Sequence, residues 1–272
     1  MSDIPQNSDT TIESFLMKIL AIGDIVGSRS VDYLSDRLFR VKAELGVDFV
    51  VANAENASDI HGVSVKDATA VFDAGVDVIT LGNHTYGRRD ICELLSSDAK
   101  IIRPANYPPL APGAGYLITE WCGTRILCIN VLGTALMEAL ACPFDTVEKI
   151  LAAECGNYDI AIMDIHAEAT SEKIALARYF DGKISVMFGT HTHVQTADEQ
   201  ILPKGSGYIT DLGMSGPVNS VIGTDTSLVI EKLRTKMPVR FTVADGEIKV
   251  CGALFDVDVS FGRTHSVRRI KF

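Results

Sequence analysis

Five short apolar runs of the sequence each end in side chains that can bind a metal ion. The runs are KILAIGD, FVVANAEN, VDVITLGNH, DIAIMDIHAE and ISVMFGTHTH, and the candidate ligands at their ends are Asp24, Glu55, Asn56, Asn83, His84, His166, His191 and His193. Four of the six histidines of the chain lie at these ends. Carboxylate, amide oxygen and imidazole donors without thiolate suit Fe, Mn, Zn or Co. The pattern therefore predicts a metal centre.

Each of these residues has an ordinary explanation when it is taken alone. Asp24 follows a glycine after a strand-like run, a place where aspartate commonly caps a helix. Asn56 and Asn83 fit turns, and a solitary His166 fits a hydrogen-bonded histidine of the core. In open α/β sheets, however, ligands bind in the crevice at the carboxyl ends of the strands. Because five consecutive runs place polar donors there, the joint pattern favours the metal site.

The number of donors predicts two ions rather than one. Eight candidates exceed the needs of a single tetrahedral ion, whereas two ions at the ~3.5–4 Å separation of two-metal hydrolytic sites, sharing a carboxylate, would use them. Glu55 is favoured over Asp24 as the shared ligand, because it stands midway through the series and beside Asn56. We expect two divalent or mixed-valence ions, Fe or Mn, with Zn as a further option.

The elements that position these donors alternate between strands and helices. The five runs are rich in β-branched residues and are typical of buried strands of a parallel sheet. Between the first two runs a single apolar stripe predicts an amphipathic helix, formed by Val31, Leu34, Leu38, Val41 and Leu45. This βαβ alternation indicates a layered α/β domain.

Two turn signals predict hairpins in the remaining parts of the chain. Cys122-Gly123 separates two strand-like runs within residues 115–132. Asp245-Gly246 lies in the β-rich region that follows residue 200. Because no linker, repeat or low-complexity tract interrupts the pattern, we expect one domain over residues 17–272, preceded by a flexible extension over residues 1–16.

The composition of the chain argues against long nucleic acid and membranes as binding partners. With 35 acidic and 25 basic side chains among 272 residues, the formal charge of −10 disfavours a protein that wraps long nucleic acid, but leaves room for a small anionic substrate. No apolar stretch reaches the ~20 residues of a membrane span, and the first residues lack a secretory signal. Six cysteines standing singly in apolar runs predict buried, reduced thiols. We expect a cytoplasmic protein, a homo-oligomer that contacts neither membrane nor long nucleic acid.

The motifs GDIVG, NAENA, TLGNHT, DIHAEATSEK and GTHTHVQTAD resemble those of the YmdB-type branch of the calcineurin-like metallophosphoesterases. The resemblance runs from about Met17 to the C-terminus and includes ILPKGSGYITDLGMSGP and PVRFTVADGEIKV. It implies an α/β sandwich in which two packed mixed β-sheets are flanked by helices.

The resemblance also implies a role for each donor. One ion would be held by Asp24, Glu55, Asn56 and His193, and the other by Glu55, Asn83, His166 and His191, with Glu55 bridging. His84 would be the proton donor. Apart from the resemblance, the position of Asp211 and Ser215 in the loop TDLGMSG leads us to expect that they support the site from outside the ligand set. His61, in the polar loop DIHGVS, is expected at the rim of the site rather than in contact with substrate.

The activity implied by the resemblance is hydrolysis of 2′,3′-cyclic nucleoside monophosphates and other small phosphodiesters, by attack of a metal-bridging hydroxide. Two alternatives remain open from the sequence: a phosphomonoesterase such as a nucleotidase, and a regulatory protein that uses the metal site as a ligand sensor. The chain departs from the family pattern at Thr134, Tyr86-Gly87 and Val218-Asn219. None of these positions is a proposed ligand, so the departures bear on substrate preference and rate.

Overall fold

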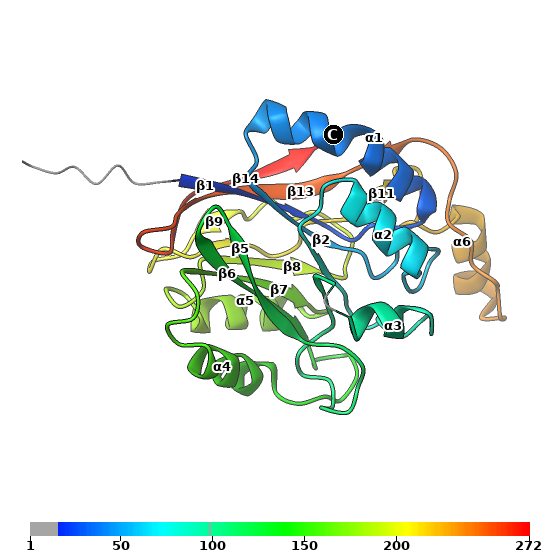
Figure 1. The fold of residues 1–272 in the computed structure, drawn as a ribbon. Helices are drawn as coiled ribbons and strands as arrows, with labels where there is room; N and C mark the ends of the chain where they lie inside the picture. The colour runs from blue at the N-terminus through cyan, green and yellow to red at the C-terminus, as the bar shows by residue number, and fades with distance from the viewer. Residues whose placement is uncertain (1–15, 98) are drawn as a thin grey trace, which may run out of the picture.

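A computed structural model describes residues 16–97 and 99–272, which form two mixed β-sheets packed face to face (Figure 1). In sheet order, the first contains β14 (Arg263–Lys271), β13 (Cys251–Asp258), β1 (Leu16–Ile22), β2 (Phe49–Asn53), β3 (Val78–Thr80) and β4 (Ile101–Ile102). The second contains β5 (Tyr116–Trp121), β6 (Thr124–Leu132), β7 (Ile160–His166), β8 (Val186–Thr190), β10 (Gly207–Ile209) and β9 (Gln200–Ile201). This is the sandwich that the family resemblance implies.

The five donor-bearing runs do form strands, but they do not share the single parallel sheet that their pattern predicts. β1, β2 and β3 pair in parallel within the first sheet, and β7 and β8 pair in parallel within the second. Each sheet packs against helices on one face and against the other sheet on its second face. Inner strands of both sheets are therefore similarly apolar. The pattern therefore identifies the strands without assigning them to a sheet.

Helices cover the outer face of each sheet (Figure 1). The helices are α1 (Ser28–Leu45), α2 (Val65–Asp73), α3 (Ile91–Leu95), α4 (Pro143–Ala153), α5 (Thr170–Tyr179) and α6 (Thr226–Thr235). α1, α2 and α3 pack on the first sheet, and α4 and α5 pack on the second. α6 contributes no buried residue to either layer.

Alternating side chains of β1 show how one strand serves two cores. Met17 and Ile19 point between the sheets and contact apolar residues of the second sheet. Leu20 and Ile22 point to the opposite face and pack beneath α1. This alternation is the period of two expected of a strand, so β1 contributes both to the core between the sheets and to the core beneath α1.

One predicted hairpin is confirmed and the other is wrong. β5 and β6 pair antiparallel around Cys122 and Gly123, whose φ angles of 46° and 84° suit a tight hairpin turn. After Asp245-Gly246, β12 (Ile248–Lys249) pairs instead with β11 (Gly216–Pro217). Asp245 forms an ion pair with Arg29 of α1 at 2.7 Å. The turn signal predicts that the segments on either side of Asp245-Gly246 pair with each other. β12 instead pairs with β11, which lies about 30 residues earlier in the chain.

Three further expectations concern the ends and surface of the chain. The extension expected over residues 1–16 lies outside the described residues, apart from Leu16, which begins β1. The expectation of buried thiols holds for Cys128 and Cys251 but is wrong for Cys122, Cys142 and Cys155, which are exposed. Among the described residues, no helix combines the length and apolarity needed to cross a membrane.

Candidate metal centre

The structure gathers the donors predicted from the sequence into one cluster beside a cleft, where strands of both sheets end. Asp24 follows β1, Glu55 and Asn56 follow β2, Asn83 and His84 follow β3, His166 ends β7, and His191 and His193 follow β8. The cleft has a volume of about 370 Å³, and Glu55, His84, His191 and His193 are among the residues that line it. Its position is the one expected for ligand binding in α/β folds.

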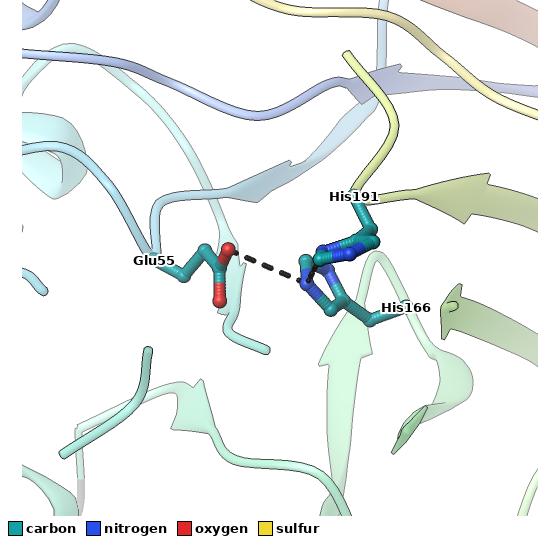
Figure 2. A group of neighbouring side chains, drawn as sticks. All are labelled: Glu55, His166 and His191. Carbon is teal, nitrogen blue, oxygen red and sulfur yellow. Dashed lines mark hydrogen bonds and ion pairs between the residues drawn. The ribbon is translucent and has the colours of Figure 1, made fainter. Parts of the chain in front are cut away.

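Glu55, His166 and His191 form the centre of the cluster (Figure 2). One ligand atom from each residue lies within 4.8 Å of the ligand atoms of the other two. Glu55 Oε1 is 3.3 Å from His166 Nε2, and His191 Nδ1 is 3.1 Å from that same nitrogen. Glu55 and His166 are only 1% and 0% exposed. A carboxylate and two imidazoles that converge in this way, largely shielded from water, can serve as ligands of a divalent cation.

The charges of this trio differ in a way that burial and contact explain. Burial opposes ionisation of Glu55, but His166 and His84 outweigh it and hold the pKa of Glu55 well below its usual range. Burial also opposes a charge on His166, yet Glu55 raises the pKa of His166 to about 9. Burial lowers the pKa of His191 to about 4. At neutral pH His166 therefore holds a proton at the point where the donors meet, and His191 is neutral.

A buried chain of hydrogen bonds orients His166. Its Nδ1 lies 2.8 Å from Thr190 Oγ1, and the Thr190 hydroxyl donates to Asp164 Oδ1 at 2.7 Å. Because the hydroxyl proton is directed at Asp164, Thr190 accepts a hydrogen bond from His166 Nδ1. This leaves His166 Nε2 as the ligand atom that faces Glu55, the ring orientation that outer partners commonly impose on metal-binding histidines.

Glu168 orients His191 in the same way, a role that was not predicted from the sequence. Its Oε2 lies 3.2 Å from His191 Nε2, so this nitrogen carries the proton and Nδ1 faces His166. Glu168 is half-exposed and lines the cleft. Its position two residues after His166, in the same HAE motif, is the signal that could have identified it.

Asp24 and His193 form a second pole of the cluster. His193 Nε2 is 3.7 Å from Asp24 Oδ1, and His193 Nδ1 donates to the Ile222 carbonyl at 3.0 Å. The ligand-competent nitrogen of His193 therefore faces the carboxylate. Asp24 is fully buried, and burial raises its pKa, although His193 and His166 oppose this effect. A buried carboxylate of this kind, facing an imidazole nitrogen, matches the donor chemistry of a cation site.

Asn56, Asn83 and His84 surround these charged groups. Asn56 Nδ2 donates to Glu55 Oε1 at 3.0 Å, which leaves Asn56 Oδ1 as an acceptor 2.8 Å from His84 Nδ1. The His84 backbone N–H donates to Glu55 Oε2 at 2.9 Å. Asn83 Oδ1 lies 2.9 Å from His166 Nε2. Every amide oxygen that the sequence analysis proposed as a ligand thus lies within hydrogen-bond reach of a histidine of the cluster.

The backbone that carries two histidines is strained. His191 and His193 have φ angles of 92° and 64°, a region that residues other than glycine rarely adopt. Between them, Thr192 donates to Asp211 Oδ2 through both its N–H and its hydroxyl. Lys173 is buried, and its Nζ donates to Asp211 Oδ2 at 2.7 Å. The expected support from Asp211 is therefore present. Lys173, the last residue of the motif DIHAEATSEK, adds to it in a role that the sequence did not suggest.

Gly82 makes room for the centre. A Cβ atom at this position would collide with His166 Nε2 and Glu55 Oε2. Only glycine fits between β3 and the ligand pair without moving one of them. The glycine of the GNH motif therefore has a packing role, separate from the role of the donors that follow it.

The structure shows the contacts of three further residues whose roles were open from the sequence. His61 lines the cleft as expected for a rim residue, and its Nδ1 lies 3.3 Å from His84 Nδ1. Ser215 supports Asp24 by donating its backbone N–H to the Asp24 carbonyl at 2.8 Å. Thr134 donates its backbone N–H and its hydroxyl to Glu172 and contacts none of the proposed metal ligands through these bonds.

We expect Glu168→Ala to weaken divalent metal binding by about 10- to 100-fold, the usual effect of removing an outer partner of a metal-binding histidine. The cause is loss of the acceptor that fixes His191 with Nδ1 toward the cluster. Titration with Mn²⁺ would measure the change, and excess metal should restore activity. Glu148→Ala, which removes an exposed carboxylate bound to Tyr179, is the matched control. Unchanged metal affinity in Glu168→Ala would contradict the orienting role.

Comparison with known proteins identifies relatives along nearly the whole chain. A family model described as YmdB-like protein matches residues 20–270. A 2′,3′-cyclic-nucleotide 2′-phosphodiesterase of Bacillus subtilis (strain 168) is 39% identical over 254 residues, which cover 93% of this chain and 96% of that protein. The crystal structure of a novel phosphatase from Mycoplasma pneumoniae superposes with a TM-score of 0.90 at 33% identity, covering 95% of this chain and 94% of that chain.

More distant structures share the architecture alone. A putative 5′-nucleotidase from Staphylococcus aureus matches with a TM-score of 0.61 at 13% identity, covering 94% of this chain and 54% of that chain. Two packed mixed sheets with this cleft at their strand ends define the fold class of the calcineurin-like metallophosphoesterases. Within that class, the chain belongs to the YmdB-like protein family.

Proposed function

We propose that this protein is a metal-dependent phosphodiesterase that opens 2′,3′-cyclic nucleoside monophosphates and hydrolyses other small phosphodiesters. The observation that carries the proposal is the buried convergence of Glu55, His166 and His191 in a cleft of substrate size. The name of the Bacillus subtilis relative supports the cyclic-nucleotide substrate.

The donor set would hold two ions, Fe or Mn, with Zn as a further option. One would bind Asp24, Glu55, Asn56 and His193, and the other Glu55, Asn83, His166 and His191. When bound, such ions polarise phosphoryl oxygens and lower the pKa of water to about 7. Because Asp24 and Glu55 are the only carboxylates in this ligand set, they would leave two divalent ions with a net charge of about +2, which attracts a phosphodiester monoanion.

The departing alkoxide needs a proton, and we infer that His84 provides it. Its side chain lines the cleft and is partly exposed, whereas His166 is fully enclosed. Its Nδ1 lies 2.8 Å from Asn56 Oδ1, which holds the ring beside the proposed ligands. A histidine held at this place can act as a general acid.

The decisive test is metal analysis of the purified protein, followed by turnover of cyclic and open nucleotides. We expect Mn²⁺- or Fe²⁺-dependent conversion of 2′,3′-cyclic AMP to 3′-AMP, and loss of this activity in Asp24→Ala. Faster release of phosphate from 3′-AMP or 5′-AMP would favour a phosphomonoesterase, an alternative supported by the similarity to the Mycoplasma pneumoniae phosphatase. Metal binding without any turnover would favour a ligand sensor.

Metal uptake is expected to release protons in a pH-dependent way. Because the pKa of His166 is raised to about 9 and that of His191 is lowered to about 4, the metal-free protein at pH 7.5 carries its proton on His166. An ion must displace that proton, so the apparent affinity should rise about tenfold per pH unit below pH 9 and level off above it. Calorimetry with Mn²⁺ in buffers of different ionisation enthalpy would count the protons. Release of none at pH 7.5 would contradict the placement of the proton on His166.

A further inference from the structure

The cleft contains apolar side chains that phosphate chemistry does not require. Ile60, Ile222 and Phe241 line it together with the histidines and carboxylates. Ile222 is 56% exposed and Phe241 is 36% exposed. A phosphoryl group is bound by charges and hydrogen-bond donors, so this apolar wall must contact another part of the ligand.

Ile222 is held in place at an energetic cost. Its φ angle of 47° lies in the left-handed region, which is a genuine outlier for a β-branched side chain. Strained backbone of this kind persists where the surroundings enforce it, most often at ligand-binding sites. Here the Ile222 carbonyl accepts the hydrogen bond from His193 Nδ1 at 3.0 Å. The apolar wall is therefore connected directly to one of the proposed ligands.

The segment that carries Phe241 is fixed on both sides of α6. Thr224 and Val243 form a β-bridge, and the Asp225 N–H donates to the Thr242 carbonyl at 3.0 Å. The Ala244 N–H donates to the Gly223 carbonyl at 2.9 Å. These hydrogen bonds join residues 223–225, before α6, to residues 242–244, after it. Phe241 therefore lies in a segment that is held in place by backbone hydrogen bonds.

A neighbouring hollow extends the space beside the wall. It is lined by Ile60, His61 and Phe241, which it shares with the cleft, and by the polar residues Asp59, Arg240 and Thr242. An aromatic ring with apolar neighbours and polar groups at the border matches a planar heterocycle, which has two apolar faces and a polar edge.

We propose, resting on the phosphodiesterase function proposed above, that Phe241 with Ile60 and Ile222 forms the platform on which the base of a cyclic nucleotide stacks while its phosphate lies at the metal centre. Stacking on an aromatic ring is tolerant of sequence, because every base has a π-face. The platform therefore selects nucleotides over phosphodiesters without a base and discriminates weakly among the bases.

The test compares 2′,3′-cyclic AMP with glycerol 1,2-cyclic phosphate, which has the same type of five-membered phosphodiester ring and no base. In Phe241→Ala, the ratio of kcat/KM for the nucleotide to kcat/KM for the glycerol compound should fall about tenfold, equivalent to about 1.4 kcal/mol. Phe241→Trp should keep this ratio within about twofold of the parent value. Phe241→Leu should lower the ratio nearly as much as Phe241→Ala does, because leucine lacks a π-face. Leu233→Ala, an exposed apolar residue of α6 outside the cleft lining, should leave the ratio unchanged.

A second variant separates the platform from a general defect. Ile222→Gly keeps the carbonyl that accepts from His193 and removes the strain, so it should resist denaturant better than the parent protein and still show a lowered ratio. An unchanged ratio in Phe241→Ala, or an equal loss on both substrates, would overturn the platform. Failure of the parent protein to hydrolyse either compound would instead refute the phosphodiesterase. In that case, calorimetric binding of 3′-AMP to the same variants, expected to be about tenfold weaker in Phe241→Ala, still decides the platform.

Discussion

Glu55→Gln is expected to lose at least one metal ion per chain and to lower the turnover of 2′,3′-cyclic AMP by about a thousandfold or more, beyond the loss typical of a single electrostatic contact in an active site. The change keeps the size of the side chain and removes its charge. That carboxylate lies 3.3 Å from both His166 Nε2 and His84 Nδ1, and it accepts the N–H of His84. Its loss would weaken both proposed ions at once, because Glu55 is the proposed shared ligand.

Elemental analysis of the variant, together with kinetics over a range of Mn²⁺ concentrations, would measure both effects. Glu120→Gln, which removes one exposed carboxylate of β5, controls for the change in net charge. Circular dichroism would establish that both variants fold. A Glu55→Gln protein that retained two tightly bound ions would rule out the bridging assignment, even if its activity were low.

The sequence predicted the donors because their positions follow from topology. β2 is apolar up to its last residue, Asn53, so Glu55 is conspicuous as the first acidic residue that follows it. His166 is likewise conspicuous as the last residue of β7, a strand that is otherwise apolar except for Asp164. Parallel strands bring such ends to one edge within each sheet, which predicted the grouping of donors from the same sheet. The meeting of the two sheets at this edge follows from how they pack and was not visible in the sequence.

The residues that orient the donors could not be found in this way. Thr190 and Lys173 are ordinary members of β8 and α5, and their roles depend on which side chains the packing of strand, helix and loop brings beside them. Glu168 lies within a recognised motif, DIHAEATSEK, yet its contact with His191 crosses from the end of β7 to the end of β8. Phe241 reaches the cleft only because Val243 and Thr224 pair around α6. Such pairings over long or irregular connections leave no periodic signal in the sequence.

The same limit explains the wrong hairpin. Asp245-Gly246 has the composition of a two-residue turn, and local preference alone would pair the flanking segments. Val243 and Ile248 instead bridge to Thr224 and Pro217, which belong to other parts of the chain. Tertiary pairing overrides the turn preference at this point, and the consequence is functional, because it brings the Phe241 segment beside the cleft.

His84 is expected to show its role through the dependence of rate on the leaving group. The His84 side chain is partly exposed. Its Nδ1 is hydrogen-bonded to Asn56, another residue of the cluster, and not to a residue outside the cluster. His166, His191 and His193 each direct their second nitrogen away from the cluster, to Thr190, Glu168 and Ile222. That difference separates a group that moves a proton from groups that are held as ligands.

Replacing His84 by Ala should therefore lower the turnover of 2′,3′-cyclic AMP by about 100- to 10,000-fold, the range of general acid catalysis. Its turnover of bis(4-nitrophenyl) phosphate should fall by less than about tenfold, because nitrophenolate leaves without protonation. His265→Ala, which removes a half-exposed histidine paired with Asp258, is the control for loss of an imidazole. Equal losses on both substrates, with the metal content unchanged, would mean that His84 binds the phosphoryl group or its ions and does not protonate the leaving oxygen.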